Sequence, residues 1–164
     1  MGHHITAIIL KGDFDKIKAA DFDLIAKGLG FELTLFHVDH YYSAYWQHKL
    51  ESSGQLEISN VDNFLFPSEI ALAEIMRKVS HNKDPEYAII QTEYFGGKGK
   101  QHANVFKGYL NIDKNISTIN QALRYLGVTA VSNIDEFETV GLDKIRQQPD
   151  FLDKYIDLAE ENGK

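Results

Sequence analysis

The chain has 164 residues, of which 24 are acidic and 17 are basic, and its net charge is −7. This length predicts one globular domain, 1–164, that buries a core without the help of a metal ion. The sequence holds no cysteine, which excludes disulfides, thiolate metal sites and a cysteine nucleophile.

The charge and the hydropathy pattern indicate where the protein is located and which kinds of partner it binds. An acidic chain argues against nucleic acid as a partner, because nucleic acid binding normally uses a basic face. No stretch approaches the roughly 20 apolar residues that span a bilayer, and the first residues lack the basic start of a signal peptide. We therefore expect a cytoplasmic protein without membrane contact and without a cofactor. His3 and His4 are either native or a tag remnant, and the absence of a linker favours native residues.

The first predicted elements are a strand, a helix and a second strand. The run Ile5–Leu10 is apolar on both faces, which is typical of a central strand. Near-helical apolar spacing predicts a helix over 14–27, ended by Gly28 and Gly30. Phe31–Val38 follows as a strand, so we expect a right-handed crossover and partly parallel strand order.

An aromatic segment comes next. Residues 39–50 contain no turn residue and predict a helix capped by Asp39. Tyr42 and Trp46 stand one helical turn apart on it. Aromatic side chains with a polar group either belong to a core or anchor a protein interface, so we take both as candidate binding residues.

Histidines in the same segment suggest a metal site, but their spacing does not support one. His37 and Asp39 would share one side of a strand, with His40 on the other, and a helix would place His40 and His48 about two turns apart. Neither geometry gathers three ligands, and no H-E-x-x-H motif is present. We predict no metal site.

Leu56–Ile58 and Phe64–Phe66 are short candidate strands. Ser68 is a candidate cap for a helix whose apolar stripe runs from Ile70 to Val79.

The most specific local pattern is a pair of strand-like runs, Tyr87–Phe95 and His102–Leu110, around a glycine-rich turn. A Gly-Gly-Lys-Gly-Lys run can cradle phosphate, but no capped helix follows it. An antiparallel hairpin with Gly96–Gly99 as its loop is the favoured interpretation.

That hairpin would place four polar side chains on one sheet face. With a four-residue loop, Glu93 lies opposite His102, and Gln91 lies opposite Asn104. A carboxylate beside an imidazole is the core of a general-base site, so Glu93 and His102 are candidate catalytic residues. Gln91 and Asn104 are candidate binding residues. The alternative is a salt-linked pair on a solvated face or a satisfied polar cluster under a loop.

The C-terminal part adds two helices. Apolar spacing from Ile116 to Leu126 predicts an amphipathic helix that Gly127 ends, and an acidic helix covers 150–161. Arg146, which follows an acidic run, either pairs with a carboxylate or contributes to a site. Together the elements predict an α+β fold: a mixed sheet of about five strands with an antiparallel hairpin, covered by helices as an α/β sandwich.

Several short runs stand out in the C-terminal half: Glu93-Tyr94-Phe95-Gly96-Gly97, Gly99, Gln101, Ile119-Asn120-Gln121-Ala122-Leu123, Asp135-Glu136-Phe137 and Gly141-Leu142. Over residues 86–146 they resemble a bacterial protein family that has no assigned activity, and the resemblance transfers no catalytic residue. The size of that family is similar to that of the immunity proteins of bacterial toxin systems, which implies a basic protein such as a toxin as partner. Gln101 is a further candidate binding residue.

Three functions fit these patterns. The first is a non-catalytic protein-binding module, such as an immunity-type inhibitor of a toxin. The second is a small hydrolase or transferase in which Glu93 and His102 act as acid and base, supported by Gln91, Asn104 and Arg146. The third is a structural or oligomerising domain.

Overall fold

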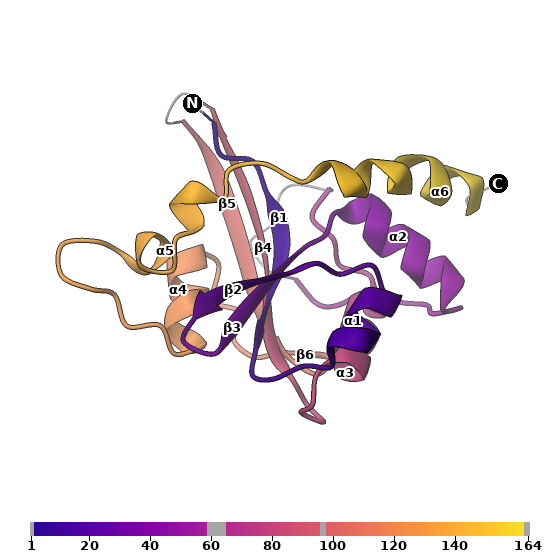
Figure 1. Cartoon of the computed structure of the whole chain (residues 1–164), viewed down its shortest axis with the longest axis horizontal. Helices are drawn as coiled ribbons and strands as arrows, with labels where there is room; N and C mark the ends of the chain where they lie inside the picture. The colour runs from indigo at the N-terminus through magenta and orange to yellow at the C-terminus, as the bar shows by residue number, and fades with distance from the viewer. Residues whose placement is uncertain (1, 59–64, 96–97, 163–164) are drawn as a thin grey trace.

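Figure 1 shows a six-stranded sheet with helices on both of its faces. The computed structural model describes residues 2–58, 65–95 and 98–162. The strands are β1 (Thr6–Lys11), β2 (Ala26–Gly30), β3 (Leu33–His37), β4 (Glu86–Phe95), β5 (Lys98–Lys107) and β6 (Leu110–Asn111). The α-helices are α1 (Lys16–Asp21), α2 (His40–Lys49), α3 (Ile70–Val79), α4 (Ile119–Tyr125), α5 (Glu136–Thr139) and α6 (Lys154–Asn162), and the 3-10 helices are η1 (Leu142–Lys144) and η2 (Asp150–Asp153).

The strand order is β2-β3-β1-β4-β5-β6, and each ladder between these strands is antiparallel. The predicted α+β class is confirmed, and so is the central position of β1. The expected parallel order is wrong. Strands β1 and β2 do run in the same direction, but β3 lies between them and is antiparallel to both.

The parallel order fails because the helix predicted over 14–27 is too long. Helix α1 ends at Asp21, and Asp23 adopts a left-handed backbone conformation with φ of 59°. The chain then forms β2 and turns at Phe31 and Glu32, both with positive φ, as a tight hairpin turn requires. Phe31 therefore lies in an exposed turn and not in the strand predicted to begin there.

Helices α2 and α3 match the predictions, whereas the segment between them does not. Asp39 caps α2 by accepting a hydrogen bond from the amide of Tyr42. Helix α3 has its predicted range, but its cap position is Glu69 and not Ser68. Leu56–Ile58 is not a strand, and Phe64 lies outside the described residues.

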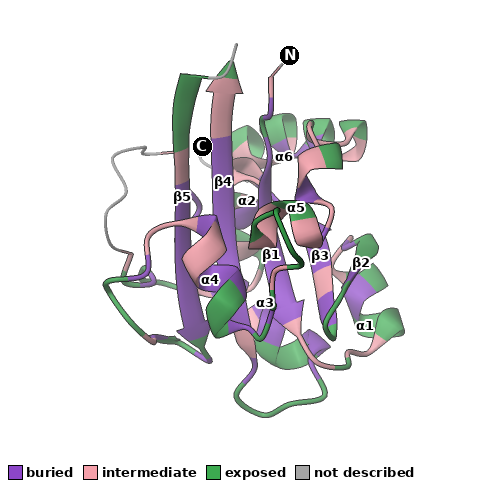
Figure 2. Cartoon of the chain, turned by 90° about the vertical axis from the view of Figure 1, so that its left-hand side faces the viewer, coloured by how far each residue is buried: buried purple, intermediate pink, exposed green. Residues whose placement is uncertain are grey.

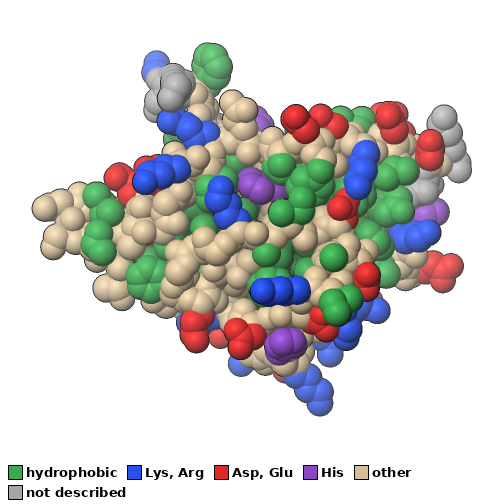
Figure 3. Space-filling model, in the orientation of Figure 1, with side chains coloured by type: hydrophobic (Ala, Val, Ile, Leu, Met, Phe, Trp, Pro, Cys, Tyr) green, Lys and Arg blue, Asp and Glu red, His purple; other side chains and the backbone are tan. Residues whose placement is uncertain are grey.

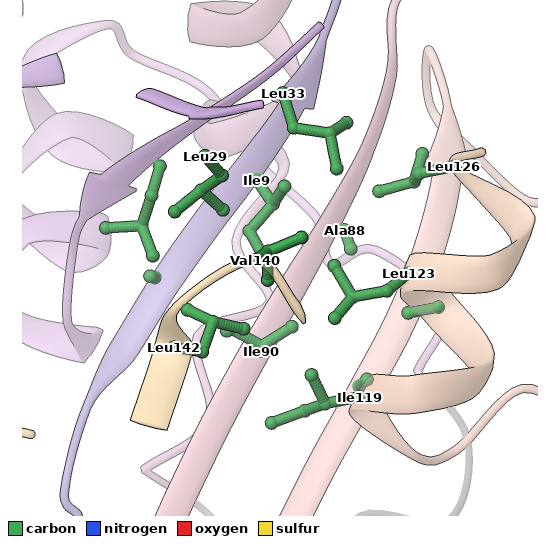
Figure 4. Packing of buried hydrophobic residues seen from close by; sticks show 14 of the residues in the cluster. Ile9, Leu29, Leu33, Ala88, Ile90, Ile119, Leu123, Leu126, Val140 and Leu142 are labelled. Carbon is green, nitrogen blue, oxygen red and sulfur yellow. The ribbon is translucent and has the colours of Figure 1, made fainter. Parts of the chain in front are cut away.

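The sheet separates two apolar cores, because alternate side chains of each strand point to opposite faces. One core lies under α4, α5 and η1, and Figure 4 labels Ile9, Ile90 and Leu123 among its residues. The other lies under α1, α2, α3 and α6 and includes Ile8 and Ile89. Neighbouring residues of β1 thus serve different cores, which explains a strand that is apolar on both faces.

The C-terminal segment passes from one face of the sheet to the other. Figure 2 shows α4 and α5 in front of the sheet, and Figure 1 shows the chain running from there over one end of the sheet to α6 on the opposite face. Gly127 ends α4 as predicted, with φ of 104°. Near the end of the chain, Leu152 of η2 and Tyr155 of α6 are buried, whereas Ile156 is exposed. None of the described helices has the length and apolar character to cross a lipid bilayer.

Candidate functional site

The β4–β5 hairpin has a tighter register than the sequence predicts. Phe95 pairs with Lys98, so only residues 96 and 97 lie between the strands, outside the described residues. The antiparallel hairpin is confirmed, and the four-residue loop is wrong. Gly99 explains the difference: a Cβ atom there would lie 1.8 Å from the carbonyl oxygen of Glu93. Glycine alone therefore lets the two strands stay this close near the turn.

The tighter register changes the pairing of the candidate catalytic residues. Glu93 lies opposite Lys100, and His102 lies opposite Gln91, so the predicted Glu93–His102 pairing is wrong. The shift is an even number of residues. Gln91, Glu93, His102 and Asn104 therefore still share one face of the sheet, as predicted.

That shared face is buried near its centre. Gln91 and His102 are each 5% exposed, and Asn104 is fully buried. The side-chain oxygen of Asn104 accepts a hydrogen bond of 3.1 Å from Asn111. The ring of His102 lies edge-on to that of Phe66, with 6.3 Å between the centroids. The centre of this face is therefore not solvated, and the acid–base role of Glu93 and His102 stays a prediction.

The two aromatic candidates on α2 differ in exposure. Tyr42 is fully buried, and its hydroxyl donates a hydrogen bond of 2.5 Å to the carbonyl oxygen of Phe22. Burial raises the pKa of Tyr42 well above 10, which keeps the hydroxyl protonated as this bond requires. Trp46 is half-buried and packs edge-on against Phe22 at 5.0 Å. The core interpretation therefore describes Tyr42, and an interface role for Trp46 stays a prediction.

A pocket of about 340 Å³ opens on the other face of the hairpin. We call it the N-terminal pocket. Its walls come from distant segments: the first residues, the end of the hairpin, α4, α5 and η1 with the residues after it. The pocket is lined by His3, Tyr94, Gln101, Asn120, Asp135, Phe137, Asp143 and Arg146.

A second pocket, the hairpin cleft, adjoins the first. Its volume is about 510 Å³, and it shares Tyr94 and Arg146 with the N-terminal pocket. Phe95, one of its lining residues, is 88% exposed. Figure 3 shows hydrophobic and basic side chains on this projecting end of the hairpin. The cleft is lined by Gly2, His4, Glu93, Tyr94, Phe95, Arg146 and Gln147.

His3 holds the N-terminal wall in place through both ring nitrogens. Nε2 lies 2.7 Å from the carbonyl oxygen of Leu142 and must donate to it. Nδ1 lies 2.7 Å from the hydroxyl oxygen of Thr92, and that oxygen accepts from the amide of Ile5. Both nitrogens are thus engaged, and His3 acts as a structural residue of the pocket.

Two amide side chains fix the opposite walls. Gln101 accepts from the backbone amide of Ile119 at 2.8 Å and donates to the hydroxyl of Tyr94 at 3.1 Å. Asn120 accepts from the amide of Phe137 at 2.9 Å and donates to the carboxylate of Asp135 at 3.0 Å. Each amide therefore joins two chain segments. The pocket walls are held before any ligand arrives, which reduces the entropy cost of binding.

Arg146 and Asp143 are charged residues of the pocket whose side chains make fewer hydrogen bonds to described residues than those of His3, Gln101 and Asn120. Nε of Arg146 donates to the carbonyl oxygen of Gly2 at 3.2 Å. Oδ1 of Asp143 is buried and accepts no hydrogen bond from any residue that the structure describes. A buried carboxylate oxygen without a donor is costly. The pocket lining thus combines two carboxylates, a cation and two aromatic rings.

This arrangement can recognise a polar group, but it lacks the ligands of a metal site. Across residues 2–58, 65–95 and 98–162, no group of three or more His, Asp or Glu side chains is placed to hold a metal ion.

The sequence identifies part of this pocket. It points to Gln101 and Arg146, but not to His3, Asn120 or Asp143 as site residues. The hydrogen-bond partners of His3 stand 89 and 139 residues away along the chain, so no local spacing signals its role. Asn120 does belong to the run that carries the resemblance, and this is the signal that would have found it.

Comparisons with known proteins give no identification of the chain. No protein-family model, no curated protein and no solved structure matches this chain.

Proposed function

We propose that this chain is a non-catalytic protein-binding module that holds its partner at the end of the β4–β5 hairpin. The observation that carries the proposal is Phe95, whose side chain is 88% exposed between the strand ends and the hairpin cleft. Large aromatic side chains beside a pocket are typical anchors of protein interfaces. The pre-formed walls of the N-terminal pocket support a recognition role.

An immunity-type inhibitor that binds a basic bacterial toxin in the cytoplasm is the specific form that we propose. The net charge of −7 supports it, since charge complementarity speeds association with a basic protein and disfavours acidic competitors. Acidic side chains visible along α6 in Figure 3 extend this charge beyond the pockets.

The proposal is tested with a partner obtained by affinity capture from the source cells and then purified. Binding is measured by calorimetry for the wild type and for Phe95→Ala. We expect Phe95→Ala to weaken the complex by about 30-fold or more, because truncating an aromatic anchor typically removes at least 2 kcal/mol.

Ile17→Ala is the matched control, because Ile17 is also largely exposed, at 77%, and lies on α1 at the other end of the molecule. The control should bind like the wild type. Equal binding by Phe95→Ala and the wild type would show that the hairpin end is not the interface.

A further inference from the structure

The carboxylate of Asp143 is the least satisfied charged group at the N-terminal pocket. Its Oδ1 is buried and has no hydrogen-bond donor among the described residues, and Asp143 makes no ion pair within them. It belongs to η1, whose start is fixed by Gly141 with φ of 82°. The carboxylate therefore has a defined position at the pocket wall.

Three neutral side chains of the pocket each donate a hydrogen bond that holds a wall. The imidazole of His3 donates to Leu142, the amide of Gln101 donates to Tyr94, and that of Asn120 donates to Asp135. Turning any of them toward Asp143 would break a bond that holds a wall. A hydrogen-bond donor from outside the chain can satisfy Asp143 without breaking any of these bonds.

The remaining walls suit a long cationic side chain. Tyr94 and Phe137 both line the pocket, and Phe137 packs against the ring of His3 at 5.1 Å. Aromatic faces attract guanidinium and ammonium groups, and the aliphatic stems of arginine and lysine pack well on apolar surface. A volume of about 340 Å³ accommodates one such side chain.

Asp135 and Asp143 are two of the three charged side chains, besides His3, that line the pocket. Outside the lining, Glu136 pairs with Arg124, so the charge of Glu136 is offset. Arg146 is the opposing charge, and its Nε is held by the carbonyl oxygen of Gly2 on the side shared with the hairpin cleft. A cationic guest would meet attraction at Asp143 and repulsion at Arg146.

We propose that the N-terminal pocket receives an arginine or lysine side chain of the partner protein, with its cationic group against the carboxylate of Asp143. This inference rests on the proposed function, because it names the group of the partner that the site recognises. It also predicts opposite effects for the two charged residues. Neutralising Asp143 weakens binding, and neutralising Arg146 strengthens it.

The test uses N-acetyl-arginine amide as the probe and N-acetyl-citrulline amide as its uncharged analogue. Each is titrated into the full chain while backbone amide signals are followed by NMR. We expect the arginine compound to bind with a dissociation constant of about 1 mM and to shift the signals of residues lining the pocket. The citrulline compound should bind at least ~10-fold more weakly, since it lacks the charge. This comparison needs no variant.

Variants then assign the charge partner. Asp143→Asn should weaken binding of the arginine probe by about 10-fold or more, and Arg146→Gln should tighten it by about 2-fold to 5-fold. Asp157→Asn is the matched control, because it removes an equal charge from an exposed position on α6. It should leave the titration unchanged.

Three results overturn the inference. They are equal binding of the two probes, absence of any shift at the pocket, and weaker binding after Arg146→Gln, which indicates an anionic guest. The proposed function is judged separately. Suppose that the captured partner binds Asp143→Asn as tightly as the wild type but still requires Phe95. That result would support the proposed binding module and would refute the proposal that the pocket receives a basic side chain.

Discussion

His37 links the C-terminal segment to the sheet. Its Nδ1 donates to the side-chain oxygen of Gln148 at 2.9 Å, and the amide of Gln148 donates to the carbonyl oxygen of Val38 at 2.7 Å. Burial lowers the pKa of His37 below 6.5; the hydrogen bond to Gln148 opposes this shift, and the charge of Lys27 adds to it. The neutral imidazole is therefore the form that the fold prefers.

This preference predicts a loss of stability in mild acid. As the pH falls below about 6.5, the unfolded chain protonates His37 while the folded chain resists, so the free energy of unfolding decreases. We expect the decrease between pH 7.5 and pH 5.5 to be larger for the wild type than for His37→Gln. Urea denaturation at both pH values measures it. The same decrease in both proteins would mean that His37 does not titrate differently on folding.

At the scale of elements, the hairpin shows how closely two strands depend on one glycine. Gly99→Ala would force its Cβ atom into the backbone of Glu93, so the strands must separate near the turn. We expect a loss of about 1–3 kcal/mol in the free energy of unfolding and faster hydrogen exchange at the backbone amides of the paired residues Glu93 and Lys100. Denaturation and amide exchange measure the two effects.

Gly28→Ala is the control for this substitution. Gly28 is also an exposed strand glycine, but a Cβ atom there meets nothing within 4 Å and its φ is not positive. Its stability should stay equal to that of the wild type or rise slightly. A similar loss in both variants would attribute the effect to strand glycine in general and not to the close approach at Gly99.

The same elements show what the sequence can predict. Local signals identify β1, α2, α3 and α4, because the signal for each lies within or beside the element itself. The signal is an apolar run for β1, the Asp39 cap for α2, and an apolar stripe for α3 and for α4. Strand register depends instead on a contact between Gly99 and Glu93 across the hairpin, and the short β2 strand depends on the positive φ of Asp23. Of the pocket, only residues with a local motif are found, since its walls meet through hydrogen bonds between distant segments.

At the scale of the whole molecule, one sheet serves two cores. Ile8 and Ile9 are neighbours in β1 but contribute to opposite cores, so neither core can open without disturbing the strand that the other requires. The chain should therefore unfold in one cooperative transition.

Leu123→Ala tests this coupling. Leu123 lies in the core under α4, whereas Trp46, the only tryptophan, packs against the core on the opposite face. The substitution should cost about 2–5 kcal/mol and lower the unfolding midpoints of tryptophan fluorescence and far-ultraviolet circular dichroism together. Fluorescence that keeps the wild-type midpoint would reveal two independently unfolding layers.

The first residues of the described chain also bear on how the molecule can be tethered. His3 is buried, and a Cβ atom on Gly2 would lie 2.9 Å from the carbonyl oxygen of Tyr94, so this strip of backbone is fitted tightly against the hairpin. Any polypeptide fused ahead of Gly2 emerges beside the hairpin cleft. Helix α6 runs away from both pockets toward the far side of the molecule. A fluorophore, surface linker or affinity handle attached after α6 leaves the recognition surface open, whereas the same handle at the other terminus competes with whatever binds there.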